Sequence, residues 1–302
     1  MNFADTLRRA STPAQVLEHE PMARHTTMRV GGPADLLFSP ASEGELTFAV
    51  QAAREAGMPV RIIGNGSNLL VLDGGLRGLT IRLGEAFSEI SVDGDRISAQ
   101  AGALLSRVAA AARDAALTGL EFASGIPGSV GGGMAMNAGA YGGQLSDVFE
   151  RCRALDPETG VISVLGPDEM ALGYRESAAL KRGLIVTSAV FHLKRGDKAD
   201  IQAKMEDLNA RRRDKQPLNL PSAGSTFKRP EGYFAGALIE QAGLKGLRVG
   251  GASVSEKHAG FVVNDAGATA GNVLALIRLV QARVLENSGV QLETEVRILG
   301  EE

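Results

Sequence analysis

The chain of 302 residues carries 32 Lys and Arg against 35 Asp and Glu, giving a formal net charge of −3, and it has no Trp and only 3 Tyr. This length accommodates about two or three domains, and the balanced charge and scarce aromatic side chains argue against nucleic acid as a partner. The single Cys152 excludes an internal disulfide, and its simplest interpretation is a small buried apolar residue; the four scattered His predict no metal site.

Residues 1–23 are predicted to form a short helix and an N-terminal arm, without the apolar core of a signal peptide. No apolar run approaches the roughly 18 residues that a membrane span requires. We therefore expect a cytoplasmic protein that has no membrane partner. Residues 24–75 are predicted to be a small α/β subdomain, with a strand at 35–39, a helix that begins after Ser42 and ends near Gly57, and a strand at 60–63.

Residues 76–196 are predicted to be a second, mixed subdomain. Strands are expected at 79–83, 90–92 and 97–99, and Asp93-Gly94 between the last two is a hairpin signal. A long glycine loop is expected to follow the next helix, with further strands at 148–155, 161–165 and 184–193. The apolar residues that predict this helix are Leu105, Val108, Ala109, Ala112 and Ala116.

Residues 197–302 are predicted to form a further α+β domain. Its expected elements are a helix through 201–213, a polar turn region at 219–230, helices at 233–242 and 273–284, and a strand at 290–299. Arg211, Arg212 and Arg213 fall near the end of the first helix, where cations favourably oppose the helix dipole, so this basic run needs no ligand.

Two glycine-rich segments are candidates for anion binding. Residues 124–143 contain a run of Gly and Pro, and Gly64-Asn65-Gly66-Ser67-Asn68 directly follows the strand at 60–63. Backbone N–H groups in such turns can approach phosphate oxygens closely, so two turns indicate a ligand with two phosphates. The alternative is tight turns with no ligand. The Walker phosphate loop and the dinucleotide-fold fingerprint are both absent from the sequence.

Seven segments together resemble the UDP-N-acetylenolpyruvoylglucosamine reductase (MurB) family, in its shorter form. The motifs occur in the family's order over nearly the whole chain: Thr27-Met28-Arg29-Val30-Gly31-Gly32-Pro33-Ala34, Gly64-Asn65-Gly66-Ser67-Asn68, Gly125-Ile126-Pro127-Gly128-Ser129-Val130-Gly131-Gly132, Met136-Asn137-Ala138-Gly139-Ala140-Tyr141-Gly142, Gly173-Tyr174-Arg175-Glu176-Ser177, Ala223-Gly224-Ser225-Thr226-Phe227-Lys228 and Leu292-Glu293-Thr294-Glu295-Val296.

The resemblance implies an α+β protein with an FAD-binding fold of the vanillyl-alcohol oxidase type. Residues 24–196 would bind FAD, with subdomains at about 24–75 and 76–196, and residues 197–302 would bind substrate. The implied reaction is reduction of the enolpyruvyl ether of UDP-N-acetylglucosamine to UDP-N-acetylmuramate by NADPH, for peptidoglycan synthesis. The expected FAD-binding residues are Gly64, Asn65, Gly66, Ser67, Asn68, Gly125, Ile126, Pro127, Gly128, Ser129, Gly131 and Gly132.

Three residues match the family's catalytic positions. Arg175 would bind the substrate carboxylate bidentately as negative charge develops on it, Ser225 would donate a proton to the adjacent carbon, and Glu295 would act with Arg175 on the enolate. Without the motifs, Arg175 is an ordinary surface arginine and Ser225 a turn former. Spacing alone does not separate Glu295 from Glu293, which would share its strand face.

Substrate contacts are expected from Tyr174, Lys228, Arg229 and His258. About fifty residues separate Arg175 from Ser225, which leaves no obvious room for the lid loop of the family's longer form. Two other functions are considered. A flavin oxidase of the same fold predicts a His or Cys for covalent flavin near the glycine turns, and none is present there. A non-catalytic sugar-nucleotide binder predicts loss of a catalytic residue, and all three are present.

Overall fold

The computed structural model describes residues 3–12 and 15–302, so four positions of the predicted N-terminal arm, at 1–2 and 13–14, lie outside the described residues. The chain forms two compact units that are each assembled from separate segments. Unit one comprises residues 1–18, 36–65 and 78–211, and unit two comprises residues 19–35, 66–77 and 212–302. The chain therefore passes between the units several times.

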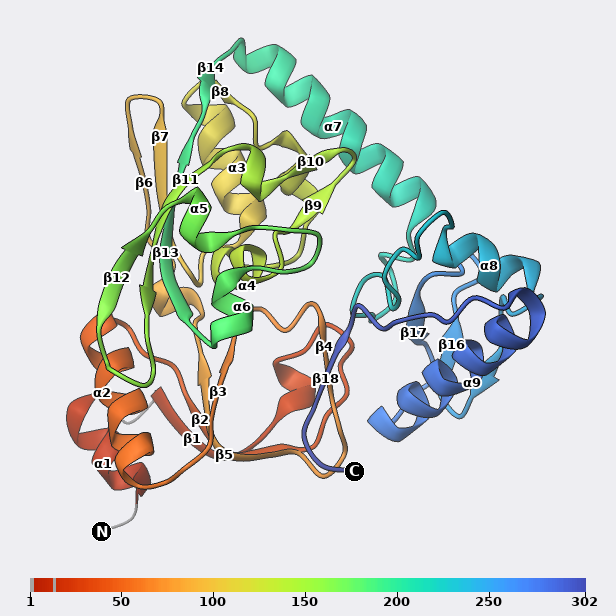
Figure 1. The fold of residues 1–302 in the computed structure, drawn as a ribbon, viewed down its shortest axis with the longest axis horizontal. Helices are drawn as coiled ribbons and strands as arrows, with labels where there is room; N and C mark the ends of the chain where they lie inside the picture. The colour runs from red at the N-terminus through yellow and green to blue at the C-terminus, as the bar shows by residue number, and fades with distance from the viewer. Residues whose placement is uncertain (1–2, 13–14) are drawn as a thin grey trace. The chain divides into compact units, whose positions relative to one another are not determined.

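A five-stranded antiparallel sheet forms the centre of unit one (Figure 1). Its spatial order is β12 (Ile162–Leu165), β11 (Phe149–Leu155), β13 (Ile185–His192), β7 (Arg96–Gln100) and β6 (Ile90–Asp93). The turn between β6 and β7 has φ of 60° at Gly94, which confirms the predicted hairpin. Residues from this sheet and from α3 (Leu105–Asp114), α4 (Val130–Ala135) and α7 (Lys198–Lys215) share one buried apolar core.

A second core of unit one lies under α1 (Phe3–Ala10) and α2 (Glu43–Glu55). The associated sheet has the order β1 (Val16–Pro21), β2 (Pro33–Phe38), β5 (Leu76–Arg82) and β3 (Val60–Ile63), with β3 and β5 parallel. The division into units falls within β1, β2 and β5. The predicted helix after Ser42 is confirmed, because the Ser42 side chain accepts a hydrogen bond from Glu45 N, and Leu46, Ala49, Val50 and Ala53 are buried.

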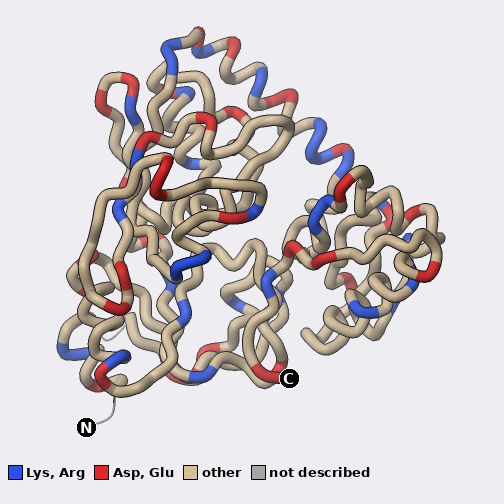
Figure 2. The backbone as a smooth tube through the Cα atoms, in the orientation of Figure 1, with Lys and Arg blue, Asp and Glu red and all other residues tan. Residues whose placement is uncertain are grey.

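Short elements complete unit one. They are η3 (Glu85–Phe87), β8 (Leu117–Thr118), η4 (Glu121–Gly125), β9 (Gly139–Ala140), β10 (Gly143–Gln144), η5 (Leu145–Asp147), α5 (Pro167–Met170), α6 (Ala178–Arg182) and β14 (Lys194–Arg195). Helix α7 begins in this unit and its last residues belong to unit two. Figure 2 shows Lys and Arg interspersed with Asp and Glu along α7, as on a solvated helix.

Unit two is built around α9 (Ala270–Ser288), which packs on the antiparallel strands β15 (Arg248–Val249), β16 (Ala252–Val254) and β17 (Val262–Asn264). Thr269 caps the start of α9, and Gly289, with φ of 72°, ends it. Helix α8 (Ala235–Gln241) shares this core, and β4 (Leu69–Val71) pairs in parallel with β18 (Arg297–Leu299). The short helix η2 (Met22–Arg24) also belongs here.

Several predicted boundaries are wrong. Helix α3 ends at Asp114, and Ala116 lies beyond it with φ of 56°, a left-handed conformation that prevents continuation of the helix. The glycine-rich stretch is not a continuous loop, because it contains the end of η4 and all of α4. The predicted helix at 233–242 begins only at Ala235.

The predicted strand at 290–299 forms only as β18, at Arg297–Leu299. The backbone before it forms only an isolated antiparallel bridge between Phe227 and Thr294, in which Lys228 N donates to the Glu293 carbonyl and Glu295 N to the Thr226 carbonyl. None of the helices in the described ranges is both long and apolar enough to cross a membrane, and no group of three or more potential metal-binding side chains occurs in residues 3–12 and 15–302.

Candidate functional site

The two glycine turns meet in unit one. A Cβ on Gly64 would lie 2.2 Å from the Ser129 hydroxyl oxygen, so the absence of a side chain at Gly64 allows this contact. The neighbouring Asn65 Nδ2 donates a hydrogen bond of 2.6 Å to the Pro127 carbonyl. The segments that the sequence singled out separately therefore form one local structure, about sixty residues apart in the chain.

The Ser129 hydroxyl has no hydrogen-bond partner although its residue is only 2% exposed. An unsatisfied buried hydroxyl costs about 1–3 kcal/mol, so such groups usually have a partner in the functional state. Ser129 lies at the junction of the two glycine turns, where a phosphate oxygen was expected. The site therefore offers a hydroxyl donor to a bound ligand, which fits the predicted diphosphate.

The other glycine-stretch residues mainly let the backbone pack closely. Gly131 N donates to the Ala101 carbonyl at 2.8 Å, and a Cβ on Gly131 would lie 2.9 Å from the Ala101 Cβ. The Gly128 carbonyl accepts from Leu105 N, whereas Ile126 N closes the end of η4 on Ala123. Two further predicted residues lie at the ends of this local structure, with Gly125 at the last position of η4 and Gly132 on the exposed side of α4.

The second half of the Gly64–Asn68 turn belongs to unit two. Gly66 has φ of 64°, and a Cβ there would lie 2.0 Å from the His25 carbonyl oxygen, so only glycine fits. Ser67 follows in the turn before β4. Asn68 Nδ2 donates a hydrogen bond of 3.0 Å to the Glu295 carbonyl, an anchoring contact that the predicted FAD role did not include.

Arg175 sits in a tight turn with an unusual backbone. Gly173 N donates to the Glu176 carbonyl at 3.0 Å, and Arg175 occupies the third position of this turn with φ of 58°. Glycine or asparagine is favoured there, since a left-handed conformation costs a larger residue about 1–2 kcal/mol. The Arg175 guanidinium carbon lies 5.1 Å from the ring centre of Tyr174, which is 56% exposed. An observed strained arginine points to a functional constraint on its position.

Two side chains anchor this turn to the glycine stretch. Asn137 Nδ2 donates to the Gly173 carbonyl at 3.2 Å, and the Ser177 hydroxyl donates to the Ala135 carbonyl at 2.9 Å. Ser177 also accepts from Leu180 N and thereby caps α6. Both residues occur in the family motifs, but neither was predicted to have a role. No local pattern in the sequence reveals a contact between residues about forty positions apart.

Ser225 and Glu295 are brought together by the backbone of unit two. Between them lies Thr226, whose carbonyl accepts from Glu295 N at 2.8 Å and whose N–H donates to the Gly260 carbonyl at 2.9 Å. The Thr226 hydroxyl accepts from Val262 N at 3.0 Å. Ser225 is exposed and follows Gly224, which has φ of 74°. We call residues 225–228 with 293–295 the Ser225 strip.

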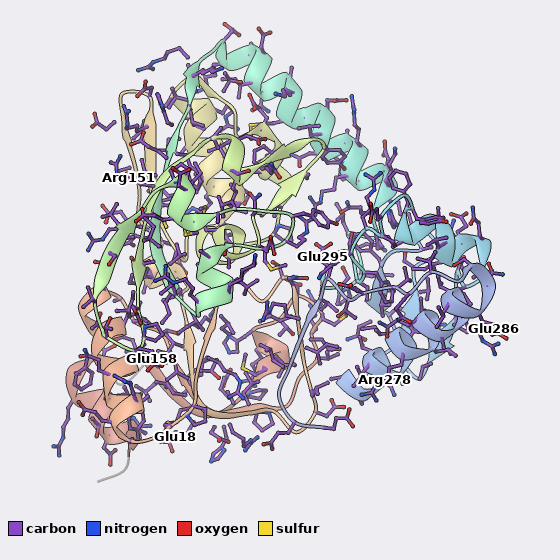
Figure 3. All side chains as sticks on the ribbon, viewed as in Figure 1. Glu18, Arg151, Glu158, Arg278, Glu286 and Glu295 are labelled. Carbon is purple, nitrogen blue, oxygen red and sulfur yellow. The ribbon has the colours of Figure 1, made fainter. Side chains whose placement is uncertain are left out.

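The two candidate glutamates have different surroundings. Glu295 is half-buried in the segment before β18, where Figure 3 labels it, and its carbonyl is held by Asn68. The Glu293 side chain is 71% exposed and pairs with Lys228 Nζ at 3.0 Å. Glu295 is the better candidate for chemistry, because it is less exposed than Glu293 and its backbone carbonyl is anchored.

The remaining predicted substrate residues also lie in unit two. The Arg229 guanidinium carbon stands 4.0 Å from the ring centre of Phe234, which is 61% exposed, and its Nε donates to the Tyr233 carbonyl. His258 Nδ1 accepts from Gly260 N at 3.1 Å, and burial lowers the pKa of its imidazole, so the ring is favoured in the neutral form. Burial raises the pKa of the Cys152 thiol to about 12, as befits an unreactive core residue.

Two family models match the chain. Residues 34–166 match an FAD binding domain, and residues 216–299 match the C-terminal domain of UDP-N-acetylenolpyruvoylglucosamine reductase. Among curated relatives, the UDP-N-acetylenolpyruvoylglucosamine reductase of Syntrophomonas wolfei is 48% identical over 290 residues, covering 96% of this chain and 97% of that protein. The Clostridium botulinum protein of the same name is 51% identical over 287 residues, covering 95% and 93%.

Solved structures give the same picture. The crystal structure of UDP-N-acetylenolpyruvylglucosamine reductase (MurB) from Thermus caldophilus has a TM-score of 0.80 and 38% identity, covering 94% of this chain and 97% of that one. Wild-type Phl p 4.0202, a glucose dehydrogenase, has a TM-score of 0.52 at 17% identity, covering 66% and 45%, which is a likeness of fold alone. The predicted α+β architecture with an FAD-binding fold of the vanillyl-alcohol oxidase type is confirmed.

Proposed function

Because the chain belongs to the UDP-N-acetylenolpyruvoylglucosamine reductase family, we propose that it reduces the enolpyruvyl ether of UDP-N-acetylglucosamine to UDP-N-acetylmuramate with NADPH. The predicted enzyme class is confirmed: the chain is an FAD-dependent oxidoreductase of peptidoglycan synthesis. The observation that carries the proposal is 48% identity to a named reductase over nearly the whole of both chains. We further propose that it acts in the cytoplasm.

We assign FAD to the junction of the glycine turns, where Gly64, Asn65 and the unpartnered Ser129 hydroxyl would hold its diphosphate. When bound, FAD supplies the hydride that the vinyl carbon of the substrate receives. The predicted division into an FAD-binding region at 24–196 and a substrate-binding region at 197–302 is retained as part of this proposal, with support from the two family-model matches.

The protein residues manage charge and protons on the substrate. The Arg175 guanidinium binds the substrate carboxylate through two parallel N–H donors. This interaction strengthens as negative charge spreads onto the carboxylate oxygens during the reaction. The Ser225 hydroxyl donates a proton to the carbon next to the carboxylate, and Glu295 acts with Arg175 on the enolate. Tyr174, Lys228, Arg229 and His258 are assigned to binding of the substrate and NADPH. Support comes from the strained Arg175 turn and from the backbone contact that fixes Ser225 beside Glu295.

Anaerobic mixing of the purified FAD-loaded protein with NADPH, and then with the enolpyruvyl sugar nucleotide, tests this function. Flavin absorbance is expected to fall on addition of NADPH and to return stoichiometrically with the sugar nucleotide, with UDP-N-acetylmuramate as the product. Oxygen is the matched alternative oxidant. Rapid return with oxygen and none with the sugar nucleotide would instead identify a flavin oxidase of this fold.

A further inference from the structure

Asn137 connects the glycine-rich stretch at 124–143 with the turn at 173–176, which lies about thirty residues later in the chain. It is 2% exposed, and its backbone has φ of 43°, a conformation that asparagine tolerates better than most residues. Its side chain lies among Gln144, Ser146 and the carbonyl of Gly173. Asn137 thus joins the glycine stretch to the first residue of the Arg175 turn, within unit one.

The orientation of the Asn137 amide follows from its partners. Ser146 N can only donate, and it lies 3.0 Å from Oδ1, which makes that atom the oxygen. Nδ2 therefore faces the Gly173 carbonyl at 3.2 Å, with Gln144 Oε1 and Ser146 Oγ both at 3.3 Å. An amide has only two N–H donors, so the three acceptors share them, and the shortest contact is the one to Gly173.

The Gly173 carbonyl is the point at which the Arg175 turn closes. It also accepts from Glu176 N, at 3.4 Å, and this bond is longer than the one that Gly173 N makes to Glu176. The strained φ of 58° at Arg175 must be maintained by the surroundings, because the turn itself favours glycine there. A buried amide that holds Gly173 from outside the turn supplies this constraint.

We propose that Asn137 is the positioning residue for Arg175: its Nδ2–H to the Gly173 carbonyl fixes the turn so that the guanidinium meets the substrate carboxylate. This inference rests on the proposed function of Arg175. It assigns Asn137 no contact with substrate or flavin. A displacement of about 1 Å in a positioned group can reduce a rate about 10²-fold, so loss of this hydrogen bond should slow the reaction even in a variant that still folds.

Asn137→Asp is the sharpest variant, since it retains an oxygen for Ser146 N but replaces the donor that faces Gly173. Asn137→Gly accepts the positive φ without strain and removes the whole side chain. Ser146→Ala is the matched control, because it removes one of the other acceptors and leaves the contact with Gly173. Flavin content, flavin reduction by NADPH and flavin reoxidation by the enolpyruvyl sugar nucleotide are measured separately for each variant.

We expect reoxidation to slow about 10- to 100-fold in Asn137→Asp and Asn137→Gly, with flavin content and reduction by NADPH within about 3-fold of the parent. In Ser146→Ala, all three quantities should stay within about 3-fold of the parent. In an Arg175→Ala background, which keeps the strained φ without the guanidinium, Asn137→Asp should add less than about 3-fold. If Asn137→Asp does not fold, Asn137→Gly is measured in its place; it removes the acceptor of Ser146 N as well as the donor to Gly173.

Three results would overturn the positioning role. These are reoxidation at the parent rate in both Asn137 variants, equal slowing of both half-reactions, and an undiminished effect of Asn137→Asp in the Arg175→Ala background. If Arg175→Ala alone is reoxidised by the sugar nucleotide at the parent rate, Arg175 does not have its proposed function, and positioning it then has no effect on the reaction. If Arg175→Ala is reoxidised slowly and Asn137→Asp at the parent rate, only the positioning role of Asn137 is overturned, and the proposed function of Arg175 stands.

Discussion

The Arg175 turn in unit one and the Ser225 strip in unit two hold their candidate catalytic residues by different means. Arg175 has a strained φ of 58°, and side chains of Asn137 and Ser177 anchor its turn. The strip is held mainly by backbone hydrogen bonds, in which Thr226 contacts both Gly260 and Glu295, while the side chains of Asn68 and Thr226 add one hydrogen bond each. Substitution can remove a side-chain anchor, whereas a backbone hydrogen bond survives most substitutions. The geometry of Arg175 should therefore depend more on the identity of its neighbours than the geometry of Ser225 does.

The largest expected effect comes from the strip, where the reacting group itself can be removed without moving the backbone. Ser225→Ala should leave FAD binding and flavin reduction by NADPH nearly intact and slow reoxidation by the sugar nucleotide about 10²–10⁴-fold, the range of a lost general acid. Ser225→Cys retains a proton donor and should recover part of the rate. Stopped-flow absorbance of each half-reaction measures both. Unchanged reoxidation in the alanine variant would exclude Ser225 from the reaction.

On the Arg175 side, function and stability should separate. Arg175→Gly relieves a left-handed conformation worth about 1–2 kcal/mol and loses about 0.4–1 kcal/mol through the greater freedom of the unfolded chain. The substitution also loses the contact with the Tyr174 ring, worth about 0.5–1 kcal/mol. The free energy of unfolding in urea should therefore change by less than about 1 kcal/mol, while reoxidation by the sugar nucleotide falls by at least about 10²-fold.

Arg182→Gly is the matched control for this prediction, because Arg182 is exposed at the end of α6, in ordinary helical backbone. It should lose stability by roughly the 1 kcal/mol of a glycine in a helix and keep the parent rate. A clear loss of stability in Arg175→Gly would show that the turn is not strained. A parent-like rate would show that the guanidinium is not needed.

The contrast between the two regions also explains what the sequence could predict. Periodicity located α2 and the β6–β7 hairpin because local apolar spacing and turn residues determine such elements. It failed at residues 290–296, whose conformation depends on hydrogen bonds to Thr226, nearly seventy residues away. The motifs brought Arg175, Ser225 and Glu295 into consideration, but the link from Asn137 to Gly173 depends on tertiary contacts that no local pattern records.

A smaller effect is expected at the glycine junction of unit one, where the proposed contact with the ligand is again made by a side chain, the Ser129 hydroxyl. The Cβ of Gly64→Ala would lie 2.2 Å from the Ser129 hydroxyl, which can rotate away without disturbing the fold. We expect FAD to bind about 10-fold more weakly, which corresponds to about 1.4 kcal/mol. This is close to the low end of the range of about 1.5–3 kcal/mol for one hydrogen bond to a charged group. Flavin titration of the apoprotein measures the affinity.

Ser129→Ala separates the two contributions to this result. It removes both the hydroxyl and the overlap, so Gly64→Ala should have little further effect in a Ser129→Ala background. If Gly64→Ala weakens FAD binding equally in both backgrounds, the Ser129 hydroxyl is not what holds the cofactor. Retention of parent affinity in both single variants would place the diphosphate elsewhere.

The smallest catalytic effect is expected from Thr226→Val, although Thr226 lies next to Ser225 and is only 3% exposed. The substitution removes the hydroxyl that accepts from Val262 N and leaves that buried donor unsatisfied, which costs about 1–3 kcal/mol of unfolding free energy. The backbone bonds of Thr226 to Gly260 and Glu295 remain, so both half-reactions should stay within about 3-fold of the parent. Thr226→Ser, which keeps the hydroxyl, should recover most of the stability in urea. A fall in reoxidation beyond about 10-fold in folded, FAD-loaded Thr226→Val would show that a side chain positions Ser225 as well, and the contrast between the two regions would fail.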